Sequence, residues 1–235
     1  MVASNFIDGI PVIRDAFPRT IRLVATARLR ASVLKALADS EQELAELAEI
    51  EGATSNRLIA QDHGIGGVAP EELIYNVPHS TFINASFVYA KPGQPNRFNN
   101  SSRGAWYAAL DVTTCLAEVS FHMTDFLSLT GNYSAVVDYA ELYASLAGEY
   151  VDLRAKPDHT ALSPDISTGY PAGNALAATA MAEGINGIVY PSVRHMGGTC
   201  FAVLWPHAVQ SVAQGDVYRM TWDSTPDPRI ERMTK

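Results

Sequence analysis

The chain has 235 residues and a mass of 25.4 kDa, which is enough for one large domain with a sizeable hydrophobic core. Its 47% hydrophobic and 18% charged residues are typical of a folded globular protein and argue against disorder. The 17 basic and 25 acidic residues give a net charge of −8, which argues against a nuclease or a DNA-binding regulator, because nucleic-acid affinity depends on Lys and Arg neutralising phosphates.

The first part of the chain carries a helical pattern over residues 18–60. The residues that share one face of the first predicted helix are Ala25, Leu29, Val33 and Leu37. Ser40 and Glu43 form a capping box that predicts the start of a second helix. We therefore expect two helices or a helical hairpin within an N-terminal helical extension of residues 1–75, which either packs on the main domain or offers a surface to a partner.

From about residue 80 onward, short apolar runs bounded by turn residues predict strands. A stretch rich in Pro, Gly and Asn over residues 91–104 predicts turns between the first two strands. In the last strand Tyr218, Met220 and Trp222 share one face. The predicted strands cover residues 83–90, 105–110, 133–139, 150–153, 187–191, 199–205 and 217–222.

Two helices are predicted between these strands. The first is capped by Thr113 or Thr114, and its apolar face consists of Leu116, Val119 and Met123. The second covers residues 173–183 and ends at Gly184, a good C-cap residue. Strands and helices mix without strict βαβ alternation, so residues 76–235 are predicted to form an α+β domain.

Most familiar catalytic motifs are absent from the sequence. It contains no P-loop, nucleophile elbow or H-E-x-x-H motif, and residues 64–67, the nearest match to a dinucleotide fingerprint, lack the third glycine and a preceding strand. Glu118 and His122 are four residues apart on a predicted helix and could bind a metal, but no third ligand is evident. We therefore expect no metal.

The cysteines and the N-terminus bear on the compartment. Cys115 and Cys200 make no disulfide framework and fit a reducing, cytoplasmic setting. Cys115 is expected to be a small buried residue rather than a nucleophile. Residues 1–17 lack the apolar core of an export signal, and no apolar run approaches the ~20 residues of a transmembrane helix, so no membrane attachment is expected.

Four places in the second half of the chain carry side chains suited to chemistry. Arg97 and Asn99 lie in the turn-rich stretch, Tyr107 on the next strand, Glu118 on the next helix and Ser192 just past a later strand. Glu118 points away from the apolar helix face, toward either solvent or a binding site. From pattern alone, an arginine in a turn is usually a surface charge and a tyrosine in an apolar strand usually belongs to the core.

The motifs around these residues together resemble the RES domain family over about residues 80–222. They are Arg97-Phe-Asn99, Gly104-Ala-Trp-Tyr-Ala-Ala109, Leu116-Ala-Glu-Val119 and Gly187-Ile-Val-Tyr-Pro-Ser-Val-Arg194. The resemblance implies an ADP-ribosyltransferase-like fold, with a mixed or antiparallel β core surrounded by helices, and an activity that consumes NAD+. Members are typically bacterial toxins encoded beside a Xre-like antitoxin.

The resemblance also implies roles for single residues. Arg97, Tyr107, Glu118 and Ser192 match the family's signature Arg, strand Tyr, helix Glu and late Ser. The turn departs from the family pattern, because Asn96-Arg-Phe-Asn has no preceding glycines and has Phe in place of Trp. The family also commonly has an arginine on its first strand; with that strand predicted at residues 83–90, the best positional substitute is His79, ahead of the more distant Arg57.

These residue types suit cleavage of the nicotinamide–ribose bond. Glu118 would stabilise the positive charge that builds up on the ribose, and Arg97 could bind the pyrophosphate with its bidentate fork. Tyr107 could stack on nicotinamide, Ser192 could bind the carboxamide or a ribose hydroxyl, and Asn99 could support the turn or a phosphate. No metal is needed for this reaction.

The protein partner and the acceptor of ADP-ribose are implied only by the resemblance. ADP-ribose would pass to water, to phosphate or to a protein side chain, as on phosphoribosyl pyrophosphate synthetase in one branch of the family. The expected partner is a Xre-like antitoxin that occludes the active site. The alternative is a non-catalytic module on the same fold that binds a nucleotide or a partner.

Overall fold

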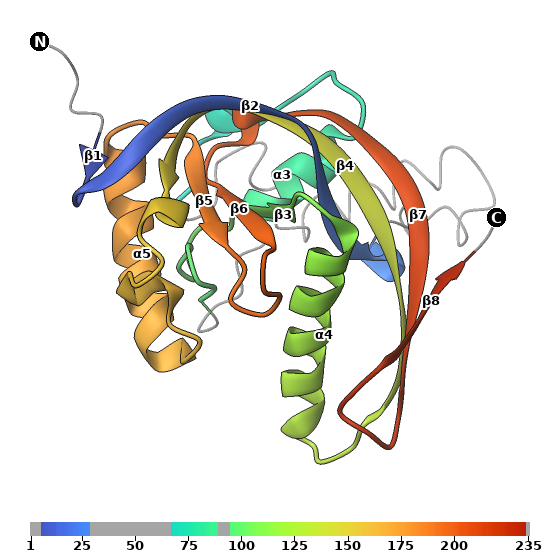
Figure 1. Cartoon of the computed structure of the whole chain (residues 1–235). Helices are drawn as coiled ribbons and strands as arrows, with labels where there is room; N and C mark the ends of the chain where they lie inside the picture. The colour runs from blue at the N-terminus through green and yellow to red at the C-terminus, as the bar shows by residue number, and fades with distance from the viewer. Residues whose placement is uncertain (1–5, 29–66, 89–94, 234–235) are drawn as a thin grey trace, which may run out of the picture.

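The computed structural model describes residues 6–28, 67–88 and 95–233 (Figure 1). In this part of the chain, eight strands form one mixed sheet in the order β1-β2-β3-β6-β5-β4-β7-β8. The strands are β1 (Phe6–Ile7), β2 (Ile10–Ala25), β3 (Trp106–Ala109), β4 (Ser134–Asp152), β5 (Gly187–Pro191), β6 (Thr199–Val203), β7 (Val209–Asp223) and β8 (Arg229–Met233). The α-helices are α3 (Ser80–Val88), α4 (Val112–Ser128) and α5 (Ile166–Ala182). Short 3-10 helices cover Thr26–Arg28, Pro70–Glu72, Leu153–Ala155, Thr160–Leu162 and Pro206–Ala208.

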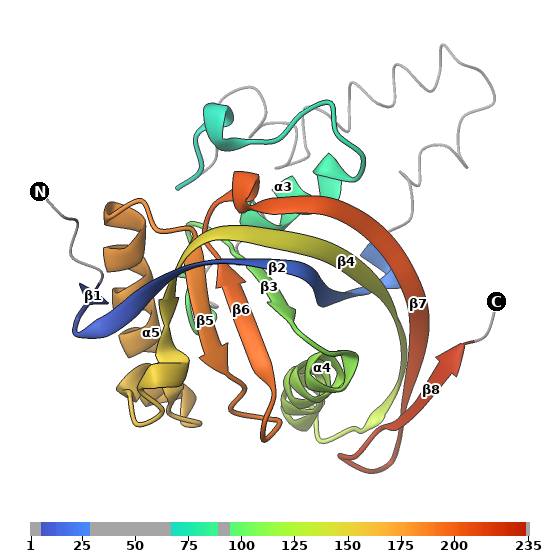
Figure 2. The same ribbon diagram turned by 45° about the horizontal axis from the view of Figure 1, so that its top comes forward.

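The sheet confirms the predicted α+β class. All of its strand pairs are antiparallel except β4 and β5, which run parallel. β2 pairs with β4 along most of its length and also touches β3, so the long strands β2, β4 and β7 arch over the short strands β3, β6 and β5 (Figure 2). None of the helices in the described part of the chain is both long and apolar enough to cross a membrane.

Alternate side chains of the short strands enter two different hydrophobic clusters, because successive residues of a strand point to opposite faces. Ile188 of β5 and Ala202 of β6 join the cluster that contains α5 and the start of α4. Val189 and Phe201 join the cluster that contains α3. The helices α4 and α5 therefore lie on one face of β5 and β6, and α3 lies on the other (Figure 1).

Several predicted elements are confirmed. β5 has the predicted bounds, and β3 and β6 lie within the predicted strands. The predicted last strand is the end of the longer β7. The face that Tyr218 shares with Met220 and Trp222 is buried, and the latter two residues are at most 2% exposed. α4 is a helix as predicted, but its cap is Asp111, whose carboxylate accepts the backbone N–H of Thr114, rather than Thr113 or Thr114.

The helical prediction for the N-terminal region is wrong over residues 18–25, although Thr26–Arg28 form a short 3-10 helix. Residues 18–25 belong to β2, whose β-branched Thr20, Ile21 and Val24 suit a strand, and β2 pairs with β4 in the central sheet. The predicted boundary near residue 75 therefore does not separate this strand from the rest of the domain. The remainder of the predicted helical pattern, residues 29–60, lies outside the described residues.

Three further elements differ from the prediction. Residues 83–88 form the end of α3 rather than a strand, and residues 89 and 90 lie outside the described part. The predicted strands at 133–139 and 150–153 are parts of the single strand β4. α5 starts at Ile166, several residues earlier than predicted, because Gly169 and Pro171 lie inside the helix rather than before it. β1 and β8 were not predicted.

Candidate functional site

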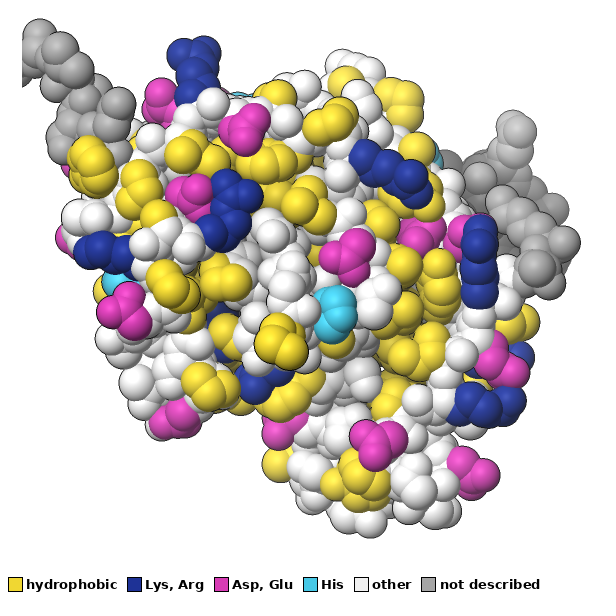
Figure 3. All heavy atoms as spheres, viewed as in Figure 1, with side chains coloured by type: hydrophobic (Ala, Val, Ile, Leu, Met, Phe, Trp, Pro, Cys, Tyr) yellow, Lys and Arg dark blue, Asp and Glu magenta, His cyan; other side chains and the backbone are white. Residues whose placement is uncertain are grey.

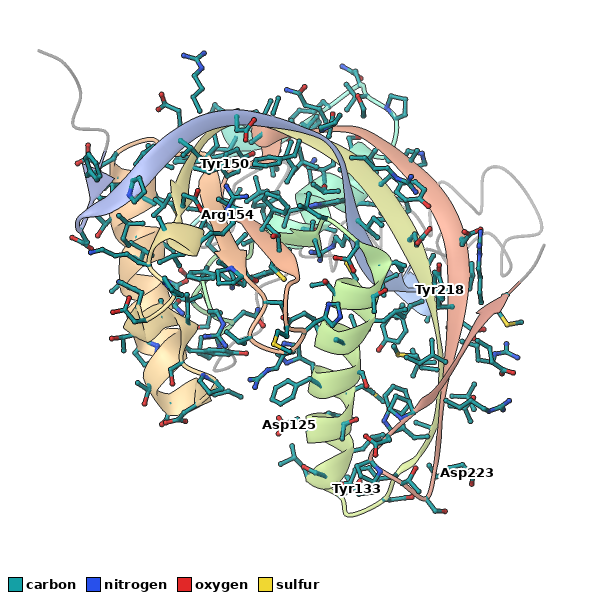
Figure 4. All side chains as sticks on the ribbon, in the orientation of Figure 1. Asp125, Tyr133, Tyr150, Arg154, Tyr218 and Asp223 are labelled. Atoms are coloured by element: carbon teal, nitrogen blue, oxygen red, sulfur yellow. The ribbon has the colours of Figure 1, made fainter. Side chains whose placement is uncertain are left out.

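The helix α4 presents two different sides. Its predicted apolar face packs against Met220 and Trp222 of β7, and the residues on that face are Leu116, Val119 and Met123. Glu118 lies on the other side of the helix, as predicted, and the structure shows it half-buried. Figure 4 shows the two sides: Tyr218 lies on the β7 side of α4, and Asp125 lies on the side toward the β5–β6 loop.

The β5–β6 loop brings Ser192 to Glu118. The Ser192 hydroxyl donates a hydrogen bond of 2.7 Å to Glu118 Oε1. Its oxygen in turn accepts the backbone N–H groups of Arg194 (3.1 Å) and His195 (3.0 Å). The backbone N–H of Ser192 donates to the carbonyl of Gly198 and closes the loop. The serine therefore fixes the loop and the carboxylate at once, although 74 positions separate the two side chains in sequence.

A second chain of hydrogen bonds fixes the same loop and was not foreseen from the sequence. Thr114 Oγ1 lies 2.7 Å from Asp111 Oδ2 and 2.9 Å from His195 Nδ1. The threonine hydroxyl has one proton, which it donates to the carboxylate, so it accepts from the imidazole. His195 Nδ1 is therefore the protonated nitrogen at this contact. The N-terminus of α4 thus holds the loop at His195, while Glu118 holds it at Ser192.

The site residues Glu118, Ser192 and His195, together with Arg97, Asn99, Tyr107 and Arg194 described next, are called the site cluster, or the cluster, below. Arg97 is buried on its α5 side and is only 6% exposed. Its Nη1 donates to the carbonyls of Ala161 (2.6 Å) and Ser163 (2.9 Å), and its guanidinium lies 5.4 Å from the ring centre of Tyr170. A Cβ atom at Gly169 would lie 2.7 Å from Arg97 Nη1, so the glycine makes room for the arginine. This fit explains why α5 contains a glycine at position 169.

Tyr107 and Asn99 form one hydrogen-bonded unit behind Arg97. The Tyr107 hydroxyl donates to Asn99 Oδ1 (2.9 Å) and accepts the backbone N–H of Phe98 (3.0 Å). Burial raises the pKa of Tyr107 well above its usual value, so the hydroxyl stays protonated. Asn99 also donates to the carbonyls of Asn100 and Arg103. The structure therefore places Asn99 as a support of the turn.

Arg194 is a further residue of the cluster. It ends the last of the four sequence motifs, but no role was predicted for it. Its guanidinium stacks on the ring of Phe121, 3.4 Å from the ring centre, and Nη2 donates to the carbonyl of Pro164 (3.1 Å). Burial and the nearby charge of Arg97 lower the pKa of Arg194, while Glu118 opposes the shift. The arginine remains charged and lies close to both residues.

His79 lies apart from the cluster. It precedes α3, which packs on the opposite face of β5 and β6, and its ring stacks on Phe82 with 5.8 Å between the centroids. The first long strand of the sheet is instead β2, and it carries Arg22, whose Nη1 donates to the Tyr107 carbonyl (3.1 Å). Arg22 was not predicted as the first-strand arginine, because residues 18–25 were predicted to be helical.

The remaining chemical candidates do not form a second centre. In the described part of the chain, no three His, Cys, Asp or Glu side chains gather as a metal site requires. Cys115 is buried as predicted; it donates to the Ile21 carbonyl, and burial raises its pKa to about 12. Lys and Arg side chains are scattered among acidic and hydrophobic ones on the face shown in Figure 3 rather than gathered into a patch.

Comparisons with known proteins agree with the motifs. A family model described as the RES domain matches residues 73–223, which is more than half of the chain. One solved structure that matches is the crystal structure of the M. tuberculosis MbcT–MbcA toxin–antitoxin complex, with 16% identity over 54% of this chain and 72% of that chain and a TM-score of 0.39. That structural likeness is too distant to carry an argument about function. No curated protein matches the chain.

Proposed function

Because the chain belongs to the RES domain family, we propose that it is the toxin of a toxin–antitoxin pair and that it breaks the nicotinamide–ribose bond of NAD+. The observation that carries this proposal is the hydrogen bond of 2.7 Å from Ser192 to Glu118. It fixes a half-buried carboxylate close to the positive charge of Arg194, which is itself close to Arg97. A dinucleotide offers the complementary charges, with a ribose that becomes positive during cleavage and a negative pyrophosphate.

In the proposed reaction the bond between the ribose C1′ and the nicotinamide nitrogen breaks, and its electron pair leaves with nicotinamide. The ribose carbon and its ring oxygen then share a positive charge, as in glycoside cleavage. The Glu118 carboxylate stabilises this charge because it is already oriented and partly shielded from water. The acceptor supplies the electron pair of the new bond to C1′ and releases a proton to solvent.

The other side chains of the cluster prepare the site for this step. Ser192 keeps the carboxylate oriented, since its hydroxyl is fixed by two backbone N–H groups of the loop. Tyr107 is held by Asn99 at its hydroxyl, and we assign its ring to stacking on the nicotinamide cation. Arg97 contributes positive charge on the side of α5, where the pyrophosphate would lie.

Family membership also supports a protein partner and a choice of acceptors. The proposed partner is a Xre-like antitoxin that covers the site in the cytoplasm and blocks NAD+. Water, phosphate or a protein such as phosphoribosyl pyrophosphate synthetase would accept the ADP-ribose. A footprint of the pair that left Arg97 and Glu118 open would contradict occlusion.

The decisive experiment follows nicotinamide release from NAD+ by proton NMR, for the wild type and Glu118→Gln. Glutamine keeps the shape of the side chain and removes its charge, so the rate should fall by about 10²-fold or more. Glu149→Gln removes an equal charge from an exposed position of β4 and should cleave like the wild type. Parallel samples with phosphate and with lysate identify the acceptor, because they yield ADP-ribose 1″-phosphate or a labelled protein instead of free ADP-ribose.

Two results would overturn the proposal. If the folded wild type, free of antitoxin, released no nicotinamide under any of these conditions, the protein would be a binding module rather than an enzyme. If Glu118→Gln cleaved at the wild-type rate, the carboxylate would have no part in the reaction.

A further inference from the structure

Two neighbouring arginines of the cluster form no ion pair within the described residues. Five ion pairs join side chains in the described part of the chain, and none of them includes Arg97 or Arg194. Their charges are close enough that Arg97 lowers the pKa of Arg194, in addition to the effect of burial. Glu118 and Asp125 oppose this effect without forming an ion pair with Arg194, and an anion bound between the two arginines would relieve their mutual repulsion.

Arg97 is the less available of the two. Its Nη1 is committed to two backbone carbonyls, and the residue is 6% exposed. Gly169 and Gly173 pack so closely against its side chain and backbone that the arginine has little room to turn. Its contacts identify it as a fixed charge that also ties the segment before α5 to the turn.

Arg194 has the opposite character. Phe121 supports the flat face of its guanidinium, and stacking uses none of the five N–H donors on the guanidinium edge. One of these donors reaches the Pro164 carbonyl at 3.1 Å, and no other hydrogen bond of the side chain is formed within the described residues. Its backbone N–H is held by the Ser192 hydroxyl, which also holds Glu118. The Ser192 hydroxyl thus links the backbone of Arg194 to the Glu118 carboxylate, while Phe121 and Pro164 hold the guanidinium.

We propose that Arg194 is the residue that binds the pyrophosphate of the dinucleotide, through the free edge of its stacked guanidinium. This inference rests on the proposed function and names the phosphate contact of the same site. A planar fork matches two phosphate oxygens, whereas an ammonium group does not. Arg97 adds its fixed charge from the other side, and Glu118 remains free to face the ribose.

The test measures binding of ADP, which carries a pyrophosphate and no nicotinamide, by isothermal titration calorimetry at constant ionic strength. Arg194→Gln should bind ADP about tenfold more weakly than the wild type, because it loses a charge-assisted hydrogen-bonded contact. Arg194→Lys keeps the charge without the fork and should fall between the two. Arg219→Gln removes an equal charge from the distant Asp138 pair and should bind like the wild type.

The stacking partner provides a second variant. Phe121→Leu keeps every donor and every charge but removes the surface that holds the guanidinium, so ADP affinity should fall by about threefold. The inference is overturned if folded Arg194→Gln binds ADP as tightly as the wild type, or if the wild type does not bind ADP.

The proposed function fails in a different way. Absence of nicotinamide release alongside ADP binding that depends on Arg194 would refute the reaction and leave the phosphate contact standing. Nicotinamide release alongside ADP binding that is independent of Arg194 would refute only the contact.

Discussion

Arg97 and Arg103 leave the same turn and end in regions of opposite character. Arg103 donates to the Glu72 carboxylate at 2.6 Å, so its charge is paired with the segment that packs beside α3. Among the described residues, the Arg97 guanidinium donates to the carbonyls of Ala161 and Ser163, lies over the Tyr170 ring and forms no ion pair, on the side of α4 and α5. Both residues are 6% exposed, so burial alone does not separate them.

The difference teaches how to distinguish a structural charge from one available to a ligand. A buried charge is costly unless it is paired, and a pair completes the electrostatic requirement of both partners. Arg103 and Glu72 satisfy each other and leave nothing for a ligand. Arg97 and Arg194 form no ion pair among the described residues, and a protein tolerates such charges where a ligand supplies the counter-charge.

The largest expected effect on stability comes from breaking the ion pair between Arg103 and Glu72. Arg103→Met should lower the free energy of unfolding by roughly 3 kcal/mol, because it leaves the mostly buried Glu72 carboxylate without its cation. Urea unfolding followed by circular dichroism measures this loss. The NAD+ cleavage rate of the folded fraction should stay within about twofold of the wild type. The Arg103 side chain hydrogen-bonds only to Gly67, Glu72 and Leu204 among the described residues, and the substitution keeps the backbone carbonyl that accepts from Asn99.

The double variant Arg103→Met/Glu72→Met tests whether the lost pair explains the loss. It should recover part of the stability, because removing both partners leaves no unpaired charge. If the second substitution lowered the free energy of unfolding by as much again as the first, the two side chains would contribute independently. The loss in Arg103→Met would then not come from the broken ion pair.

The sequence shows the strands better than the site. β5 and β6 are short apolar runs buried on both faces, which makes them easy to recognise. The same rule failed at α3, because a short apolar run does not distinguish a strand from a buried helix. β4 was predicted as two strands, and the stretch between them contains the charged residue Glu141. This residue is nevertheless 2% exposed, and its carboxylate accepts the Tyr143 hydroxyl and the Asp216 N–H.

Contacts that cross between distant segments explain what was missed at the site. Family motifs were enough to select Glu118 and Ser192, and the structure brings them together. The stacking of Arg194 on Phe121 and the bond of Thr114 to His195 join α4 to a loop about 70 to 80 positions away. Neither contact leaves a local pattern in the sequence, because each depends on how the helix packs beside the loop.

The second largest effect is expected at the site itself, where Arg97 and Arg194 form no ion pair in the described part of the chain. Ser192→Ala should slow NAD+ cleavage by about tenfold, because the Glu118 carboxylate loses the donor that orients it. The free energy of unfolding should fall by about 1 to 2 kcal/mol, since two backbone N–H groups lose their acceptor. Nicotinamide release and urea unfolding measure the two effects on the same sample.

Ser145→Ala is the matched control, because its hydroxyl makes one 3.3 Å bond to the Gln210 carbonyl away from the site. It should change neither the rate nor the stability by a measurable amount. An unaltered rate in folded Ser192→Ala would show that Glu118 does not depend on the serine.

A smaller effect is expected where α4 holds the loop from the other end. Thr114→Val keeps the shape of the side chain and removes the hydroxyl that joins Asp111 to His195. Stability should fall by about 1 kcal/mol and the cleavage rate by no more than about threefold, because Ser192 still fixes the loop. Thr114→Ser restores the hydroxyl and should recover most of both. A loss equal to that of Ser192→Ala would show that the two attachments act as one unit.

The smallest effect separates the two regions by pH. Burial raises the pKa of Glu72, but the hydrogen bond from Arg103 outweighs it with the help of the Ala69 N–H, so the net pKa lies below the usual 4.5. The unfolded chain therefore takes up a proton before the folded one does, and the stability from this pair is present above about pH 4.5 and lost as the pH falls through the folded pKa. Glu72→Gln keeps a hydrogen-bond acceptor for Arg103 without the titration, so its stability should fall less than that of the wild type between about pH 6 and about pH 3.5. Equal acid losses in the two proteins would mean that the pair does not hold the charged form of Glu72. A flatter stability profile for Glu72→Gln, with unchanged NAD+ cleavage at neutral pH, would show that the ion pair stabilises the fold near α3. It would also show that the pair has no role in the ligand site near α4 and α5.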